Sequence, residues 1–298
     1  MTGDSMIRPR SQNFIYFTAL LVAFSYNANV NASILPSQRA SPHTRSSRFD
    51  QEESIINRNG DLERLSQASR SSVTVQILNG DQKGSGILIR DNSSRPWIVT
   101  NRHVVANSSH VCIRLQNGSL IPGRVLKAKR RDFDLAFVST SQEVRPLPYA
   151  VTASHFDSMS INPIVATGYS AETDSYLETT GVTVPILRGR VLQSGYSVTY
   201  SSQIEKGMSG GGIFSDTGQV IGINALHSDP LWPGDWYDAN GSKLNEGLQR
   251  RLDSVSIGIS ITTILSELDD AIMHAAERDT TGFSCKSQKK RSDGILVR

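Results

Sequence analysis

The sequence predicts an all-β fold of two packed six-stranded antiparallel β-barrels, followed by a C-terminal helix. From Ser71 onwards, short runs rich in β-branched residues alternate with turn residues at the spacing of an all-β domain. The runs fall into two sets of about equal size, divided at Pro146 and Pro148, and six strands suffice to close a small barrel. The strong helical period comes late, with apolar residues at Ile261, Ile264, Leu265, Leu268 and Ile272.

Residues 1–32 have the pattern of an export signal peptide. Arg8 and Arg10 precede an almost wholly apolar run at residues 14–24, and small residues suited to cleavage follow at 30–32. The run is shorter than the roughly 20 residues that a membrane-spanning helix needs. We therefore expect a secreted or periplasmic protein without a stable membrane span after signal cleavage, with an uncleaved anchor as the alternative.

The first set of strands follows a flexible leader at residues 33–60, which is rich in Ser, Arg, Asn and Gln. A short helix is expected at residues 61–69. The strands are expected at residues 73–78, 86–89, 97–100, 111–115, 123–128 and 135–138. Asn79-Gly80 and Asn117-Gly118 indicate hairpins, because Asn and Gly tolerate the positive φ of tight turns.

The second set of strands is expected at residues 164–168, 181–185, 189–193, 197–200, 211–214, 219–224 and 256–259. A turn at residues 215–218 joins two of them. The helical period predicts a C-terminal helix at residues 262–278, and a shorter helix is expected within 243–252. Residues 279–298 form a basic tail.

The composition excludes some functions and leaves others open. A net charge of +3 is too small to indicate a nucleic-acid partner. The six histidines are scattered and no Cys/His cluster has metal-ligand spacing, so we expect no cofactor and no metal. Cys112 and Cys285 either form a disulfide, which export permits, or remain two free thiols.

Positive charge is concentrated in two places. One cluster lies near residues 124–131 and the other near residues 286–291. Each is explained by a solvated loop or tail, or by contact with an anionic cell surface.

Three polar residues lie beside apolar β runs in the order His, Asp, Ser. His103 lies in the stretch "VTNRHVV", Asp134 directly precedes the apolar run in "DFDLAFV", and Ser209 lies in "KGMSGGGIF". Each has an ordinary structural explanation when taken singly. Together they match one chain order of a serine-protease triad, in which an imidazole takes the serine proton and a buried carboxylate orients the imidazole.

The glycines around Ser209 have two explanations besides catalysis: a phosphate-binding loop and a simple turn. The phosphate loop fails because the stretch lacks Gly-x4-Gly-Lys-Ser/Thr and no strong helix follows it. Glycines beside a nucleophile also let backbone N–H groups face a developing oxyanion.

These three stretches, together with "GSGILI" at 84–89 and "SIGISI" at 256–261, resemble the signature blocks of trypsin-like (chymotrypsin-fold) serine proteases. Bacterial HtrA/Deg-type protease domains and exported single-domain relatives are the most similar branch. The resemblance covers residues 70–265 and implies a protease domain at 61–278, with barrels at about 70–145 and 150–262. It makes His103 the general base, Asp134 its orienting group and Ser209 the nucleophile. The N–H groups of Gly207 and Ser209 would form the oxyanion hole.

The chain also departs from that family. Met208 stands where animal trypsins carry the aspartate that pairs with a freed N-terminal amine, so a trypsin-style zymogen switch is not expected. Too few residues follow Leu265 for a PDZ domain, so PDZ-regulated behaviour is not carried over. Asp132 competes with Asp134, but alignment to the family favours the aspartate directly before Leu-Ala.

The resemblance also implies the substrate-binding residues. Gln203 would lie at the base of the primary pocket, which argues against a Lys or Arg preference because no carboxylate offsets their charge. Ala225, Leu226 and His227 would line the substrate-binding edge. A small or aliphatic residue before the cleaved bond is expected, and His227 leaves an acidic one as the alternative.

Two functions follow from these observations. The first is an exported serine endopeptidase that cleaves protein or peptide substrates through an acyl-enzyme. The second is a catalytically silent or latent protease-fold binding module, since a fold does not guarantee an activity.

Overall fold

The computed structural model describes residues 67–91, 94–140, 148–227, 235–274 and 283–285. By its internal contacts the chain divides into residues 1–53 and residues 54–298, and every described residue belongs to the second unit. The expected signal peptide, leader and basic tail lie outside the described residues, apart from residues 283–285. Within the described ranges, no helix combines the length and the apolar character needed to cross a membrane.

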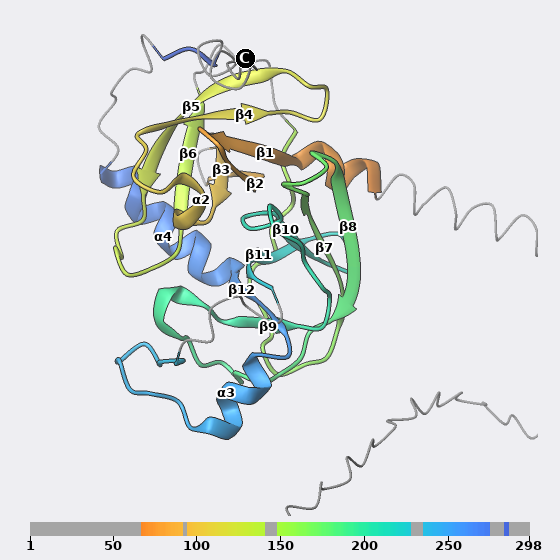
Figure 1. The fold of residues 1–298 in the computed structure, drawn as a ribbon, viewed down its shortest axis with the longest axis vertical. Coiled ribbons are helices and arrows are strands. Elements are labelled where there is room, and N and C mark those ends of the chain that lie inside the picture. Colours follow the sequence, from red (N-terminus) through yellow and green to blue (C-terminus); the bar gives the residue numbers. More distant parts are fainter. Residues whose placement is uncertain (1–66, 92–93, 141–147, 228–234, 275–282, 286–298) are drawn as a thin grey trace, which may run out of the picture. The chain divides into compact units, whose positions relative to one another are not determined.

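The first six strands form a closed antiparallel barrel in the order β1-β2-β3-β6-β5-β4 (Figure 1). Their bounds are β1 Thr74–Asn79, β2 Gln82–Arg90, β3 Pro96–Thr100, β4 His110–Arg114, β5 Leu120–Lys127 and β6 Ala136–Thr140. Gly80 and Gly118 adopt positive φ between β1 and β2 and between β4 and β5, as the hairpin signals predict. The first barrel is thereby confirmed.

The second six strands form an antiparallel sheet in the order β8-β7-β10-β11-β12-β9. Their bounds are β7 Pro163–Tyr169, β8 Tyr176–Val182, β9 Val198–Tyr200, β10 Gly212–Ser215, β11 Val220–Leu226 and β12 Ser256–Ser260. The two outer strands approach each other, because Thr183 bridges Tyr200 and the Ser201 N–H donates to the Val182 carbonyl over 2.9 Å. The sheet therefore curls into the second barrel of the expected fold.

Two expected strands of this sheet are placed wrongly. The expectation at 181–185 overlaps only the end of β8, which begins at Tyr176 after a turn at residues 170–175. Residues 189–193 form no strand, because Arg188 and Gly189 adopt φ of 49° and 81° and turn the chain there. The apolar runs in these segments pack as irregular chain in a small satellite core that contains Leu187 and Leu192.

The helices lie at the edges of the two barrels. The C-terminal helix α4 is described at Ile261–His274, and it buries Ile264 and Leu268 in the main core. The shorter helix α3 spans Glu246–Leu252, and the Asn245 side chain caps it by accepting from the Leu248 N–H. Residues 67–73 are helical and lead directly into β1.

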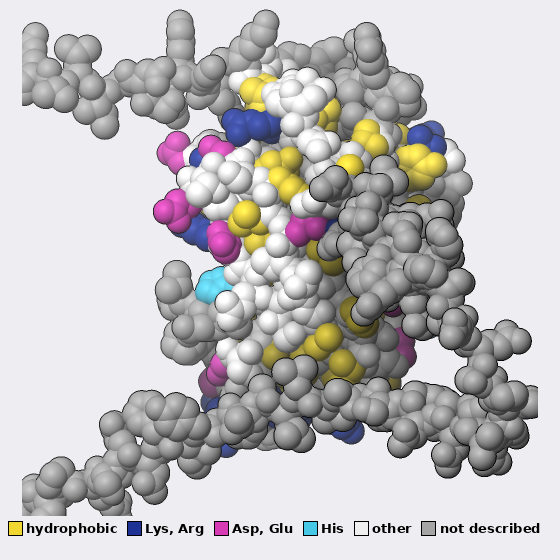
Figure 2. Space-filling model, turned by 90° about the vertical axis from the view of Figure 1, so that its right-hand side faces the viewer, with side chains coloured by type: hydrophobic (Ala, Val, Ile, Leu, Met, Phe, Trp, Pro, Cys, Tyr) yellow, Lys and Arg dark blue, Asp and Glu magenta, His cyan; other side chains and the backbone are white. Residues whose placement is uncertain are grey.

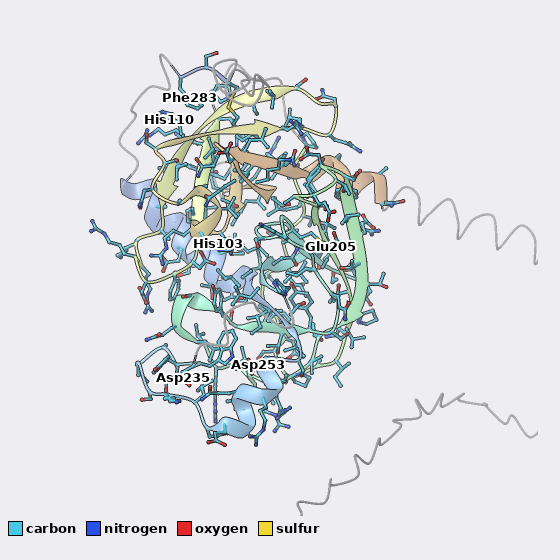
Figure 3. All side chains as sticks on the ribbon, in the orientation of Figure 1. His103, His110, Glu205, Asp235, Asp253 and Phe283 are labelled. Atoms are coloured by element: carbon cyan, nitrogen blue, oxygen red, sulfur yellow. A yellow bond between two sulfur atoms is a disulfide. The ribbon has the colours of Figure 1, made fainter. Side chains whose placement is uncertain are left out.

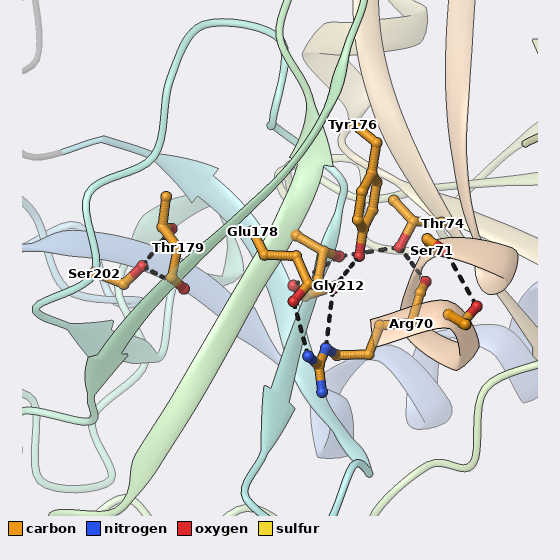
Figure 4. A network of polar contacts seen from close by, with 10 residues as sticks. Arg70, Ser71, Thr74, Tyr176, Glu178, Thr179, Ser202 and Gly212 are labelled. Carbon is orange, nitrogen blue, oxygen red and sulfur yellow. Dashed lines mark hydrogen bonds and ion pairs between the residues drawn. The ribbon is translucent and has the colours of Figure 1, made fainter. Parts of the chain in front are cut away.

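An ion pair ties the segment before β1 to the second barrel. The Arg70 guanidinium donates to both carboxylate oxygens of Glu178 in β8, over 3.1 and 2.7 Å (Figure 4). Tyr176 donates its hydroxyl to the same carboxylate over 2.5 Å. The Arg70 and Glu178 side chains are only 11% and 12% exposed, so this bidentate contact is mostly shielded from solvent.

Cys112 in β4 and Cys285 form a disulfide with a Cα–Cα distance of 5.6 Å. This arrangement is one of the two alternatives that the sequence left open. Phe283 stacks on His110 nearby, with ring centroids 5.0 Å apart (Figure 3). The bridge holds residues 283–285 against β4 of the first barrel.

Candidate active site

His103 and Asp134 meet at one end of the first barrel. β3 and β6 are antiparallel neighbours, with Thr100 opposite Ala136, so the residue after β3 lies beside the residue before β6. His103 lies in the one-turn helix α2, Arg102–Val105, which follows β3 directly. The fold therefore joins two residues that are 31 positions apart in the sequence.

The Asp134 carboxylate accepts three hydrogen bonds. His103 donates through its Nδ1 over 2.8 Å and through its backbone N–H over 2.9 Å. Tyr196 donates its hydroxyl over 3.0 Å. Asp134 is buried while the His103 side chain is 47% exposed. This arrangement fixes the imidazole ring with its Nδ1 towards the carboxylate, which leaves Nε2 to act as a base.

Tyr196 is a site residue that the sequence did not reveal. It follows a 3-10 turn, η2 Gln193–Gly195, in the second barrel. Burial, reinforced by the charge of Asp134, raises the pKa of Tyr196 well above its usual range. The hydroxyl therefore stays protonated and remains a donor. No local pattern could have marked it, because its partner is 62 residues away.

The backbone of Asp134 is also held from the second barrel. Its N–H donates to the Ser194 carbonyl over 2.9 Å, and the Asn101 side chain donates to its carbonyl over 3.1 Å. By contrast, Asp132 is 59% exposed and pairs with Arg130. The geometry thus connects Asp134, rather than Asp132, to His103.

Ser209 lies in the loop before β10, where the second barrel touches the first. A Cβ on its neighbour Gly210 would lie 2.2 Å from the Ser85 carbonyl and 3.1 Å from the Thr100 Cα, so the serine turn packs directly against the end of β3. The Ser209 hydroxyl donates to the Ala225 carbonyl over 3.1 Å. Among the described residues it makes no hydrogen bond to His103, so the structure joins two of the three expected triad residues by hydrogen bonds.

The turn before Ser209 is where the sequence predicts the oxyanion hole. The Ala171 N–H donates to the Lys206 carbonyl over 2.8 Å, which directs the N–H of the same peptide, that of Gly207, to the opposite side. Gly207 has φ of 100°, and a Cβ there would lie 2.4 Å from the Ala171 nitrogen, so only glycine fits. No described residue accepts a hydrogen bond from the N–H of Gly207 or Ser209.

Ser85 is a second residue whose role the sequence did not reveal. Its hydroxyl donates to the Gly207 carbonyl over 2.7 Å and accepts from the Tyr169 N–H over 2.8 Å. Its own N–H donates to the Ser209 carbonyl over 2.8 Å. This fully buried residue of β2 therefore holds the turn on both sides of Met208, whose side chain is also fully buried.

The expected substrate-binding residues differ in their surroundings. Gln203 is exposed, Ala225 is buried, and Leu226 and His227 are half-buried. Leu226 lines a cleft of about 1130 Å³ together with His103, Asp134 and Tyr196. His103 thus lies in the wall of this cleft, and it is labelled near the centre of Figure 3.

Comparisons with known proteins bear on the family and the fold. Residues 84–223 match the family model of the trypsin-like peptidase domain. The serine protease Do-like HtrA of Lactobacillus helveticus is 29% identical over 151 residues, which are 48% of this chain and 35% of that protein. The putative serine protease HhoB of Synechocystis sp. is 24% identical over 213 residues, which are 65% of this chain and 47% of that protein. The chain spans less than half the length of these two curated relatives.

The fold is also that of a solved structure. The serine endoprotease of Yersinia pestis superposes with a TM-score of 0.53 and 17% identity, over 70% of this chain and 65% of that one. The family model and the HtrA relatives together support a trypsin-like protease domain of the HtrA type in this chain, and the solved structure supports its two-barrel fold.

Proposed function

We propose that the protein is an exported serine endopeptidase that hydrolyses peptide bonds in protein or peptide substrates. The observation that carries the proposal is the His103 Nδ1 contact with the buried Asp134 carboxylate, 2.8 Å long, beside a glycine turn that bears Ser209. His103, Asp134 and Ser209 take the roles of base, orienting group and nucleophile.

The proposed reaction has two halves. The Ser209 Oγ attacks the peptide carbonyl carbon while His103 Nε2 takes its proton, and the carbonyl oxygen becomes an oxyanion that accepts from the Gly207 and Ser209 N–H groups. The C–N bond then breaks, and His103 returns the proton to the leaving amine. Water attacks the acyl-enzyme with the same assistance, which releases the acid and restores Ser209.

One movement must precede the attack. The Ser209 hydroxyl donates to the Ala225 carbonyl, so it has to rotate about its Cα–Cβ bond to reach His103. A bound substrate supplies a reason for the rotation, because its backbone N–H groups compete for the carbonyls at the C-terminal end of β11. Under this proposal the described conformation is a resting state.

A fluorophosphonate probe tests the proposal, because it reacts only with an activated serine. We expect the mature protein to be labelled on Ser209, and the Ser209→Ala variant to take no label. A His103→Ala variant that folds normally controls for nonspecific reaction, since it keeps the serine and removes the base. Absence of labelling in the folded wild-type protein would contradict active-site chemistry.

A latent or silent protease-fold module is the second candidate. The Ser209 contact with Ala225, in place of one with His103, favours latency. Removal of the proposed leader at residues 33–60 separates the alternatives: an active protease cleaves peptides equally with and without it, a latent one gains activity, and a silent one stays inactive.

Export rests on the N-terminal pattern and is supported by the disulfide, since such bonds persist in oxidising compartments. Mass spectrometry of the protein purified from its host tests cleavage after Ala32. A mature N-terminus at Ser33 is the expected result, and an intact N-terminus would point to the uncleaved anchor.

A further inference from the structure

The cleft beside His103 continues the expected path of the substrate. Ala225, the acceptor of the Ser209 hydroxyl, is followed in β11 by Leu226, which lines the cleft. A peptide that lies along this edge with its cleaved bond at Ser209 therefore passes Leu226 and enters the cleft. In the proposed reaction this part of the substrate is the acyl side, N-terminal to the cleaved bond.

The lining of the cleft is strongly basic. Its cationic residues are Arg102, Arg124, Lys129, Arg130 and Arg131. Asp134 is the acidic residue in the described lining, and its carboxylate is engaged by His103 and Tyr196. The five cations come from the segment that ends β5, from the loop before β6 and from α2, so the fold gathers them at one place.

Arg102 and Arg131 differ in the contacts of their guanidinium groups. Arg102 donates to the Arg131 carbonyl, which holds its head group at the loop before β6. The exposed Arg131 side chain makes no hydrogen bond or ion pair with any described residue. Arg130, by contrast, already pairs with Asp132 and stacks over Phe133. Arg131 is therefore the cation best placed to take a carboxylate.

The surroundings of the cations favour a specific ligand over bulk counter-ions. Leu126, Leu135 and Ala271 contribute apolar surface to the same lining. A cleft with charges of one sign on low-dielectric walls concentrates the field of those charges. On the face that carries β8, by contrast, acidic and basic side chains lie side by side in the upper half of the view in Figure 2.

We propose that this cleft binds acidic side chains two to four residues before the cleaved bond, so that the protein selects acidic segments of its substrates. The inference rests on the proposed peptidase function and adds the substrate class. It also revises the sequence-based explanation of the cluster near residues 124–131, which becomes a binding surface rather than a solvated loop.

Internally quenched peptides test the preference. A neutral parent peptide with an aliphatic residue before the cleaved bond receives a single Glu, Gln or Lys at each of the four positions on either side. We expect Glu at the second to fourth acyl-side positions to raise kcat/KM about two- to fivefold over Gln, because Arg131 is exposed and a solvent-accessible Arg–carboxylate pair stabilises a complex only modestly. Lys at those positions lowers kcat/KM, and added salt reduces the difference.

Reversing the charge of Arg131 tests whether the preference for acidic peptides arises in the cleft. Arg131→Glu should abolish or invert it, Arg131→Lys should retain most of it, and Arg251→Glu on the exposed face of α3 should leave it unchanged. Binding of a Glu peptide and its Gln counterpart to the Ser209→Ala variant, measured by fluorescence anisotropy, gives a readout that needs no turnover.

The outcomes separate the two proposals. Cleavage without a charge preference, or a preference that survives Arg131→Glu, overturns the acidic-substrate inference and leaves the peptidase standing. Preferential binding of the Glu peptide by Ser209→Ala, without cleavage of any peptide by the wild-type protein, supports the cleft and contradicts the peptidase. Equal binding of both peptides together with no cleavage overturns both.

Discussion

The Ser85 hydroxyl donates a 2.7 Å hydrogen bond to the Gly207 carbonyl, although 122 residues separate the two in sequence. This contact joins the first barrel to the turn that carries Ser209. Because Ser85 also binds the Tyr169 N–H and the Ser209 carbonyl, it connects β7 with both sides of that turn through one buried residue.

Replacing Ser85 by alanine should weaken both folding and catalysis. The substitution leaves the Gly207 carbonyl and the Tyr169 N–H without their buried partner, and an unsatisfied buried group costs about 1–3 kcal/mol. We expect a lower midpoint of urea unfolding and a kcat reduced about tenfold or more, since one oxyanion donor is no longer held in place. Ser254→Ala, on an exposed loop, is the matched control. An unchanged kcat in Ser85→Ala would show that the turn keeps its conformation without the hydrogen bonds of the Ser85 hydroxyl.

Tyr196→Phe removes one of the three donors to the Asp134 carboxylate and keeps the ring that packs against Trp236, at a centroid distance of 6.4 Å. The expected effect is a loss of kcat of about three- to tenfold with little change in KM, because the hydroxyl is engaged by the Asp134 carboxylate and orients it. Steady-state kinetics on one peptide substrate measure the two constants. A change confined to KM would place Tyr196 in substrate binding instead.

Alkaline pH should destabilise the fold through its buried tyrosines. Burial raises the pKa of Tyr176, Tyr196 and Tyr200 above the ordinary value of 10.0. Above pH 10 the unfolded chain loses these protons while the folded chain keeps them. The contribution of the three tyrosines to the free energy of unfolding is therefore fully present below pH 10 and decreases as the pH rises above it. Each tyrosine contributes up to about 1.4 kcal/mol per pH unit.

Thermal melts between pH 8 and 11.5, together with tyrosinate absorbance, measure this effect. In Tyr176→Phe the free energy of unfolding should fall less steeply with rising pH, because one fewer proton is released on unfolding. Complete ionisation of all eight tyrosines near pH 10 in a protein that remains folded would contradict the burial of these hydroxyls.

The disulfide should stabilise the fold across a long segment. Cys112 and Cys285 are 173 residues apart, and closing so long a loop restricts the unfolded chain strongly. We expect Cys112→Ser to lower the free energy of unfolding by about 2–4 kcal/mol. Reduction of the wild-type protein should produce the same shift, while the reductant should leave the variant unaffected. An equal response of both proteins to the reductant would argue against the bond.

The ion pair between Arg70 and Glu178 predicts an asymmetry between single and double substitutions. Arg70→Met alone leaves the Glu178 charge mostly buried and unpaired, at a cost of about 3 kcal/mol. The double variant Arg70→Met with Glu178→Met removes both charges and should be less destabilised than Arg70→Met. Urea unfolding of Arg70→Met, Glu178→Met, the double variant and the wild type completes the cycle. Additive effects would show that the two side chains act independently.

The sequence predicted the elements that local chemistry determines. Strands rich in β-branched residues, such as β3 and β11, appear where their apolar runs lie, and the Asn-Gly hairpins follow from the backbone freedom of glycine. The expected strand at 189–193 failed because the positive φ of Arg188 and Gly189 bends the chain there. Apolar content alone does not distinguish a strand from a buried irregular segment.

The residues of the site also fall into those that the sequence predicted and those that it did not. Motif order and resemblance led to His103, Asp134 and Ser209, because the chemistry requires those residue types beside rigid strands. Ser85, Tyr196 and Ala171 act through partners 62 to 122 residues away or through a backbone N–H. No pattern in one sequence encodes such contacts, so the residues that hold the site emerged only from the folded chain.

A crystal structure with a peptidyl boronic acid is the most direct test of Ser209 as the nucleophile. We expect a tetrahedral boron bonded to the Ser209 Oγ and one boron-bound oxygen that accepts from the Gly207 and Ser209 N–H groups. His103 Nε2 should lie within hydrogen-bonding distance of the bound group. A boronate that leaves the Ser209 hydroxyl on the Ala225 carbonyl, or that binds elsewhere, would contradict it.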